Sequence, residues 1–336
     1  MQPSLNCPIC KVEVEASFFK EVYASPYNNQ EYKRYECPNC DVHWWEPLKI
    51  IPEFYQSEFL EMYIAFHEGL GTRLYENHKA FFKHFPSDVR GRLLDVGCGD
   101  GRFLRYAKEQ GFEVWGIDFD KKSVENVKRN LGIDTVFAMS LEEFYKYAKE
   151  KNLKFDVITF FEVLEHQDKP REFLEMVKGL LREGGYIAGS VPNRERLFVE
   201  IDHLDYPPHH FLRFSKFSLE KALNFSGFKD VEVYELYLPF IGLFPYLEKK
   251  LFGNLDKLKI KLKGMVLGDE RKATAYAVEE LAEVSPNKGK AYMLMMMLMM
   301  LKLIKNAMLL PFALGYVGKL KEKGTGLYFQ ARYGSV

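Results

Sequence analysis

The sequence predicts a doubly wound α/β domain with a zinc ribbon in front of it and a helical insertion near its end. Two observations predict the α/β domain: apolar strand patterns alternate with helix patterns over residues 89–238, and a glycine-rich loop follows the first of these strands. Two Cys-x-x-Cys pairs within the first 50 residues predict the ribbon. Alternating strands and helices form a parallel sheet whose ligands bind at the carboxyl ends of the strands.

The 336 residues are enough for one large domain or two modest ones, and 47% of them are hydrophobic, so a sizeable core can form. We expect five parts along the chain. They are a zinc ribbon over residues 1–50, a helical cover over 51–88, a nucleotide-binding core over 89–238, a helical insertion over 239–323 and a last core strand over 324–336.

Formal charge is balanced over the whole chain but not along it. The 47 basic and 47 acidic residues cancel, which gives no bias toward nucleic acid. Residues 239–323 carry 15 Lys and Arg against 8 Asp and Glu, a net charge of +7, so the remainder of the chain carries −7. A basic segment on an otherwise acidic protein predicts a local anionic partner.

Four of the five cysteines form the pairs Cys7-Pro8-Ile9-Cys10 and Cys37-Pro38-Asn39-Cys40. Each pair fits a tight turn that directs both sulfurs at one point, and two such turns complete the tetrahedral thiolate set that zinc prefers. We therefore expect Cys7, Cys10, Cys37 and Cys40 to bind a structural zinc ion. Residues 1–47 carry 4 basic against 7 acidic residues, which argues against a phosphate-binding surface and favours a folded cap on the next domain. Because residues 1–20 lack a secretory signal pattern, we expect reduced cysteines and a cytoplasmic protein.

The core begins with the strand pattern of residues 92–96, followed by a Gly-x-Gly-x-Gly loop at Gly97, Gly99 and Gly101. Glycines permit a sharp turn and let a ligand approach the backbone closely. A second strand over residues 113–117 ends in Asp118, where a carboxylate can accept two hydrogen bonds from a ribose diol. Asp120 is typical of the N-cap of a helix over residues 121–131.

Further strands are predicted over residues 134–138, 155–161, 186–193 and 229–237, with helices between them. A seventh strand, residues 326–332, follows the long insertion, and we expect it to lie antiparallel beside the fifth.

The loop and strand-end motifs resemble those of class I S-adenosylmethionine (SAM)-dependent methyltransferases, which have a Rossmann-like sheet with the last strand antiparallel. The motifs are Leu93, Asp95-Val96-Gly97-Cys98-Gly99-Asp100-Gly101, Gly116-Ile117-Asp118, Phe155-Asp156-Val157-Ile158 and Glu162-Val163-Leu164-Glu165-His166. With its N-terminal ribbon, the chain is similar to bacterial methyltransferases that modify glycans or other small molecules.

This resemblance implies SAM as a cofactor and a set of residues around it. The three glycines approach the methionine part of SAM, and Asp95 lies near its amino group. Asp118 holds the ribose, while Phe119 and Ser140 lie near the adenine. The full implied set is Asp95, Gly97, Gly99, Gly101, Asp118, Phe119, Ser140 and Phe161.

Two constellations follow the fourth and fifth strands, where a methyl acceptor should bind. They are Glu162-x-x-Glu165-His166 and residues 202–211, which include His210. The first also resembles the metal-binding set of ubiquinone-pathway O-methyltransferases and small-RNA 3′-end methyltransferases. That resemblance implies a second divalent site, for Mg²⁺ or Mn²⁺, at Glu162, Glu165, His166 and His210. Two other interpretations stay open: His166 or His210 acts as a general base, or the segment mainly shapes the loop. We take His166, His210 and Glu162 as the catalytic candidates.

The insertion contains two uninterrupted apolar pieces, residues 291–301 and 307–317, separated by Lys302, Lys305 and Asn306. Each piece has about half the length needed to cross a bilayer core. A soluble subdomain or homodimer interface, a peripheral anchor on the inner face of the membrane, and a genuine span all fit this pattern.

We therefore expect a SAM-dependent O-methyltransferase that acts on a hydroxyl of a glycan, a lipid-linked sugar or a quinone-like acceptor. One alternative is an RNA methyltransferase with the ribbon as a clamp, but the acidity of the ribbon argues against a nucleic-acid partner. The other is a non-catalytic module that binds SAM or S-adenosylhomocysteine (SAH), against which the intact glycine loop and Asp118 argue.

Overall fold

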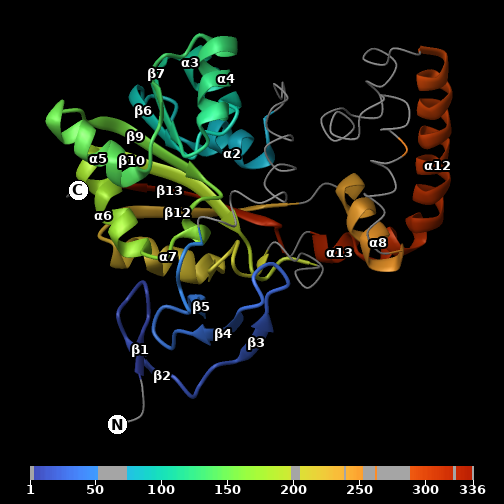
Figure 1. Cartoon of the computed structure of the whole chain (residues 1–336), viewed down its shortest axis with the longest axis horizontal. Coiled ribbons are helices and arrows are strands. Elements are labelled where there is room, and N and C mark those ends of the chain that lie inside the picture. The colour runs from blue at the N-terminus through green and yellow to red at the C-terminus, as the bar shows by residue number, and fades with distance from the viewer. Residues whose placement is uncertain are drawn as a thin grey trace.

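A seven-stranded sheet forms the centre of the molecule and carries helices on both faces (Figure 1). The structure is a computed structural model, and it describes residues 4–51, 74–197, 205–237, 240–252, 262, 288–320 and 323–334. In the view of Figure 1 the N-terminal ribbon lies below the sheet, and a group of late helices stands to one side of it.

The strands of the central sheet are arranged in the order β12-β13-β10-β9-β6-β7-β8. Their bounds are β6 (Gly91–Val96), β7 (Phe112–Asp118), β8 (Val136–Ala138), β9 (Phe155–Phe161), β10 (Leu181–Pro192), β12 (Lys229–Leu236) and β13 (Gly326–Arg332). The strand β13 lies antiparallel between β10 and β12, while β10, β9, β6, β7 and β8 are parallel. The prediction of a Rossmann-like sheet with an antiparallel last strand beside the fifth is thus confirmed.

Two layers of apolar side chains separate the sheet from its helices. One layer lies under α2 (Glu76–His84), α3 (Arg102–Glu109) and α4 (Lys121–Leu131), and the other under α5 (Leu141–Glu150), α6 (Pro170–Leu180) and α7 (Lys216–Phe225). The helix starts follow from local chemistry. Asp120 accepts hydrogen bonds from the backbone N–H groups of Lys122 and Ser123, as predicted, and Ser140 begins α5 with a reciprocal capping box to Glu143.

The chain reverses its direction of travel across the sheet between β6 and β9. The strands β7 and β8 continue to one side of β6, whereas β9 and β10 lie on its other side. In open α/β sheets, such a switch point leaves a crevice at the carboxyl ends of the two strands. The glycine loop follows β6 and the Glu162–His166 segment follows β9, so both predicted halves of the site adjoin this crevice.

The N-terminal ribbon contains two small antiparallel units. The first pairs β1 (Ser4–Asn6) with β2 (Glu13–Glu15), and the second joins β3 (Glu21–Ala24), β4 (Glu31–Glu36) and β5 (His43–Glu46). A core segment, β11 (Leu212–Arg213), adds a fourth strand to the second unit by pairing with β5. The ribbon therefore shares a sheet with the core, which is a closer connection than the packed cap that the sequence predicts.

Aromatic packing and an ion pair reinforce this junction. Trp45, Phe211 and Tyr32 are buried together, and the Trp45 backbone N–H donates to the Phe211 carbonyl at 3.0 Å. Arg194, which follows β10, is paired with Asp41 of the second cysteine turn. These contacts hold the ribbon against the segment that carries the predicted acceptor residues.

The late helices α8 (Leu243–Phe252), α12 (Lys288–Gly315) and α13 (Val317–Leu320) follow a short turn, η5 (Phe240–Gly242). Leu243, Phe244 and Leu247 of α8 pack with Leu309 and Ala313 of α12 and with Leu320. The two apolar pieces predicted for this region fall almost entirely within one helix, α12, which runs on through Lys302, Lys305 and Asn306 and ends at Gly315. Residues 52–73 of the predicted helical cover lie outside the described residues, and α2 follows them.

Candidate methyl-transfer site

The four ribbon cysteines come together at one point. The Sγ atoms of Cys7 and Cys40 are 3.5 Å apart, those of Cys10 and Cys37 are 3.3 Å apart, and all four lie within 4.8 Å of one another. These separations exceed the roughly 2.05 Å of a disulfide, and the four thiols are free. The hydrogen bond between the Cys7 and Cys40 thiols lowers the pKa of Cys7 to about 5. The donor set fits a structural zinc ion.

Matching backbone turns build the two halves of this cluster. In the first turn the Cys7 N–H donates to Val12 and the Lys11 N–H donates to Cys7; in the second, the Cys37 N–H donates to Val42 and the Asp41 N–H donates to Cys37. Lys11 and Asp41 both adopt a positive φ, of 64° and 59°. The repeated geometry follows from the repeated Cys-Pro-x-Cys sequence. The fifth cysteine, Cys98, is buried in the glycine loop.

The glycine loop after β6 adopts the sharp turn predicted for it. Gly97, Gly99 and Gly101 have φ values of 78°, 49° and 72°, where side chains are disfavoured. A Cβ atom on Gly97 would lie 2.9 Å from the Val163 side chain, and one on Gly101 would lie 2.8 Å from Val127. The loop is therefore closed to larger residues by both conformation and packing.

Asp118 connects the end of β7 to the glycine loop. Its Oδ2 atom accepts a hydrogen bond from the Gly99 N–H at 2.8 Å, and its Oδ1 atom accepts from the Asp120 N–H at 2.9 Å. The carboxylate thus lies at the carboxyl edge of the sheet, where the sequence predicts the ribose contact.

Asp95 lies in β6, on the side that pairs with β9, and is buried. It is opposite Thr159 in the register, and the Thr159 hydroxyl donates to Asp95 Oδ1 at 2.6 Å. Burial raises the pKa of Asp95 to about 8, against the effect of the Thr159 hydrogen bond. A cationic group brought beside this carboxyl would favour its charged form.

The other residues of the implied SAM set occupy the same sheet edge. Phe119 follows β7 and is 63% exposed, so its ring is accessible to a ligand. Ser140 follows β8, and its hydroxyl accepts the Glu143 N–H of the α5 cap. Phe161 ends β9 and packs edge-on against Phe103 and His78.

A buried carboxylate and two imidazoles meet in the segments that follow β9 and precede β11. The Oε1 atom of Glu165 lies 3.9 Å from His166 Nε2 and 3.9 Å from His210 Nε2. Glu165 is 1% exposed, and neither of its carboxylate oxygens makes a hydrogen bond to a residue in the described part of the chain. Burial, followed by the charge of Glu162, raises the pKa of Glu165 well above its ordinary value.

The imidazoles are held through their Nδ1 atoms. His166 Nδ1 is 2.7 Å from the His209 carbonyl, and His210 Nδ1 is 3.2 Å from Asp205 Oδ1. Since a carboxylate can only accept, the neutral His210 ring donates from Nδ1 and leaves Nε2 as an acceptor. Burial lowers the pKa of His166 to about 4 and lowers the pKa of His210 well below its ordinary value, so both rings are neutral at pH 7.

Glu162 takes a different partner from the other three predicted metal ligands. Its Oε1 atom accepts a hydrogen bond from the Ser190 hydroxyl at 2.6 Å, and Asn77 donates to the same hydroxyl at 3.0 Å. Its backbone φ is 54°, an unusual value for a residue with a side chain. Burial raises the pKa of Glu162. The structure thus joins Glu165, His166 and His210 closely, and Glu162, whose charge acts on Glu165, also accepts the hydrogen bond from Ser190.

Comparisons with known proteins agree with this geometry. A family described as a methyltransferase domain matches residues 66–233, half of the chain. The chain belongs to the class I SAM-dependent methyltransferases. Curated relatives of this methyltransferase include the ubiquinone biosynthesis O-methyltransferases of Schizosaccharomyces pombe, 31% identical over 32% of this chain and 39% of that protein, and of Bordetella avium, 32% identical over 45% and 56%. The chain therefore spans about two fifths to just over half of the length of these relatives.

Solved structures similar to this methyltransferase include a SAM-dependent methyltransferase from Archaeoglobus fulgidus. That structure is 19% identical, with a TM-score of 0.45 over 78% of this chain and 96% of the other. A putative methyltransferase in complex with the activator Trm112 from Haloferax volcanii is 14% identical, with a TM-score of 0.48 over 82% and 96%.

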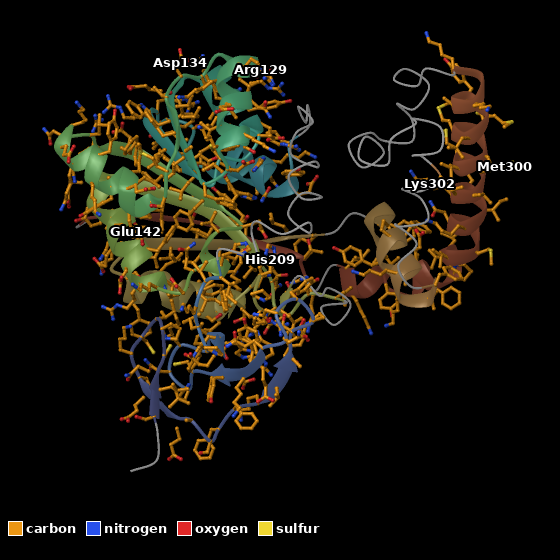
Figure 2. All side chains as sticks on the ribbon, in the orientation of Figure 1. Arg129, Asp134, Glu142, His209, Met300 and Lys302 are labelled. Carbon is orange, nitrogen blue, oxygen red and sulfur yellow. The ribbon has the colours of Figure 1, made fainter. Side chains whose placement is uncertain are left out.

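Several site residues of this methyltransferase escaped sequence reasoning. His209 was not among the candidates, yet its ring lies with those of His166 and His210, and potential ligand atoms of all three are within 4.8 Å of one another. Figure 2 shows His209 where the core meets the ribbon. The adjacent pair His209-His210 was the available signal. Asn77 and Ser190 had no signal, because their roles depend on contacts between segments 113 residues apart. Asp202 and His203 lie outside the described residues.

Proposed function

We propose that this methyltransferase transfers the methyl group of SAM to a hydroxyl oxygen of a quinone-like acceptor, such as a catechol or a hydroquinone. Two findings support this: the curated relatives are ubiquinone biosynthesis O-methyltransferases, and Glu165, His166 and His210 form a buried cluster in the segments after β9 and before β11. The cluster is the observation that carries the proposal, since methylation of a hydroxyl needs a group that accepts the hydroxyl proton or lowers the pKa of the hydroxyl.

The donor side of the crevice fits SAM. Three positive-φ glycines leave the backbone open to close approach, and the Asp118 carboxylate lies at the edge where a ribose can bind. Asp95, which is buried and has a raised pKa, suits the cationic amino group of the methionine part. In the reaction the acceptor oxygen forms a bond to the methyl carbon, the sulfur–methyl bond breaks, and SAH leaves as a neutral thioether.

The acceptor side needs a proton acceptor, because a phenol has a pKa near 10 and is a weak nucleophile while protonated. The Nδ1 atom of the neutral His210 ring faces Asp205, and its Nε2 atom faces Glu165. In a metal-free reaction the His210 ring takes the hydroxyl proton as a general base. Asp205 then stabilises the imidazolium of His210, as a carboxylate behind a catalytic histidine does.

The same side chains fit a divalent cation. Glu165 supplies a buried carboxylate without a hydrogen-bond partner in the described chain, and the two histidines have neutral rings whose Nδ1 atoms are oriented by a carbonyl and a carboxylate. Such outer contacts are typical of metal-binding histidines. A bound Mg²⁺ or Mn²⁺ would lower the pKa of the acceptor hydroxyl. Glu165, His166 and His210 would hold it, with Glu162 nearby in sequence.

The test is a methyl-transfer assay with radiolabelled SAM and four acceptor classes: catechols, hydroquinones, glycan extracts and RNA. We expect label in catechol or hydroquinone products and none in RNA. Transfer to glycans alone would move the acceptor to the sugar class while leaving the donor assignment intact. Binding of SAH without transfer to any class would leave a non-catalytic binding module.

A further inference from the structure

The helix α12 exposes apolar side chains over most of its surface. Met293, Met300 and Leu303 are 71%, 60% and 70% exposed, and further exposed apolar residues follow along its length. In Figure 1, α12 stands away from the central sheet, with α8 beside one end. Of the helices in the described ranges, α12 is long and apolar enough to reach across a bilayer. A soluble helix of this kind would be buried inside a large core.

The two mid-helix lysines of α12 lie on one line with its buried residues. Successive residues of a helix are about 100° apart, so positions three or four residues apart share a face. The residues that follow one another at these spacings are Ala291, Leu294, Leu298, Lys302, Lys305, Leu309 and Ala313. This inner line includes the four buried residues of α12 and its two mid-helix lysines. Lys305 is paired there with the buried Glu248 of α8.

The outer face has no charged residue between residues 291 and 317. Met300 and Lys302 mark the two faces, on opposite sides of α12 in Figure 2. In a helix that lies flat with this outer face toward the lipid, Lys302 and Lys305 both face the protein side. A dimer contact would cover one stripe of the apolar surface, typically about 100° wide, and leave the rest in water.

Chain connectivity favours a flat position over a span. The ion pair between Lys305 and Glu248, together with the packing of α8 on Leu309 and Ala313, places α8 against the C-terminal half of α12. If α12 crossed the bilayer, residues 253–287 would have to cross back, and they contain Asp269, Glu270 and Arg271. Charged residues are costly in the bilayer core.

Lysines surround the apolar face. Lys288 and Lys290 begin α12, Lys319 and Lys323 follow it, and α8 adds Lys249 and Lys250. Over residues 239–323 basic residues outnumber acidic ones by 15 to 8. Basic residues beside a membrane-facing helix attract anionic lipid headgroups.

We propose that α12 lies flat in the headgroup boundary of an anionic lipid bilayer, with its Met300 face among the acyl chains and its Lys302 line toward the protein. This membrane-binding activity goes beyond methyl transfer and does not depend on the identity of the acceptor. It gives the helical insertion a function that the methyl-transfer site does not require.

Vesicle flotation of the full chain tests the proposal. We expect co-flotation with vesicles that mix phosphatidylcholine and phosphatidylglycerol, and weaker binding to phosphatidylcholine alone or at high salt. The double variant Met300→Glu/Leu303→Glu should lose binding at least about tenfold, since a buried apolar side chain contributes roughly 1.5–3 kcal/mol. Phe217→Glu, which changes an exposed aromatic of α7, is the matched control and should bind like the parent. Unchanged SAH affinity in all variants shows that the core is folded.

Depth measurements distinguish the faces without a charge substitution. A tryptophan at position 300 (Met300→Trp) should be quenched by lipids brominated on their acyl chains, whereas Lys302→Trp should be quenched much less. Equal quenching at both positions would contradict the flat orientation. Failure of the parent protein to float would overturn the proposal. If the parent then self-associates in lipid-free buffer and the double variant abolishes this self-association, the apolar face of α12 is a dimer contact instead.

Discussion

The carboxylate of Asp118 accepts a hydrogen bond from the backbone N–H of Gly99 at 2.8 Å, so the end of β7 and the loop after β6 are a single structural unit. One oxygen of the carboxylate shapes the loop and the other caps the turn at Asp120. The proposed donor site therefore depends on a contact between the ends of two adjacent parallel strands.

Replacing Asp118 should weaken the binding of SAM and SAH far more than it weakens the fold. Asp118→Ala removes the loop contact and the ribose acceptor, and hydrogen bonds to charged groups contribute about 1.5–3 kcal/mol, or roughly 10- to 100-fold in affinity. Calorimetric titration with SAH measures this. The matched control is Asp120→Ala, which removes the α4 cap and should cost about 1 kcal/mol of stability with affinity nearly unchanged. Equal loss of affinity in both variants would show that the turn between β7 and α4, and not the Asp118 carboxylate itself, decides binding.

We expect turnover to depend on the zinc ribbon, because backbone hydrogen bonds connect the ribbon to the Glu165 segment. The Trp45 N–H donates to Phe211, and the Phe211 N–H donates to Glu165 at 2.9 Å, which connects the ribbon to the acceptor cluster. Cys37→Ser should release zinc, lower thermal stability and reduce turnover, while SAH affinity changes little. Metal analysis, thermal melts and calorimetry check this against Asn39→Ser, a change in the same turn that leaves all four thiols. Full turnover in a zinc-free Cys37→Ser protein would exclude a supporting role for the ribbon.

Removal of divalent cations should reduce turnover. Treatment with a chelator that leaves the ribbon zinc in place is expected to lower activity, and added Mg²⁺ or Mn²⁺ to restore it. Glu165→Gln should abolish the restoration, whereas Glu172→Gln, an exposed position on α6, should behave like the parent. If turnover is unchanged in the chelator while zinc content stays at one per chain, the histidines act as metal-free bases.

The stability of the metal-free protein should depend on pH through Glu165. Burial raises its pKa in the folded state, so the folded chain keeps a proton that the unfolded chain releases above about pH 4–5. Its contribution to stability is present below that range and is lost as pH rises. Glu165→Gln carries no such charge, and its free energy of unfolding relative to the parent should therefore increase from pH 5 to pH 8. Urea titrations in chelator measure the difference; a difference that stays constant across this range would contradict the assignment.

The lowered pKa of His166, about 4, has the opposite sign. Between about pH 6.5 and pH 4 the unfolded chain binds a proton that the folded ring does not, so stability falls as pH falls through that range. His166→Gln should make this acid-side loss shallower, and the same urea titrations, extended to pH 4, report it.

Asp205 is expected to act as a positioning residue. It accepts from His210 Nδ1 and is paired with Arg196 at 2.5 Å, so it holds the ring with Nε2 toward Glu165. Asp205→Asn should lower kcat tenfold or more and shift its pH profile, with little change in SAH affinity, because the amide can donate to Nδ1 and favour the wrong tautomer. An unshifted pH profile with lowered stability would indicate a purely structural role.

Sequence reasoning reached the core strands and the glycine loop because both depend on local patterns. The strand at residues 155–161 and the helix at 121–131 follow from apolar periodicity and the Asp120 cap, and the structure has the same bounds. The pairing of β11 with β5 could not be predicted, since a two-residue strand has no periodicity of its own. The hydrogen bond between Ser190 and Glu162 could not be predicted either, because Ser190 comes from another strand. In α12, spacing in the sequence already placed Lys302 and Lys305 on one face, but only Glu248 identified that face as the inner one.

The most direct test of the account is to identify the methylated atom. The protein is incubated with SAM that carries a ¹³C methyl group and with a catechol acceptor, and the product is examined by NMR in parallel for the parent, Asp118→Ala and Glu165→Gln. We predict a methyl ether on one phenolic oxygen from the parent and strongly reduced product from both variants. A labelled methyl group on nitrogen or carbon, or a parent protein that consumes no SAM with any hydroxyl acceptor, would contradict the central claim.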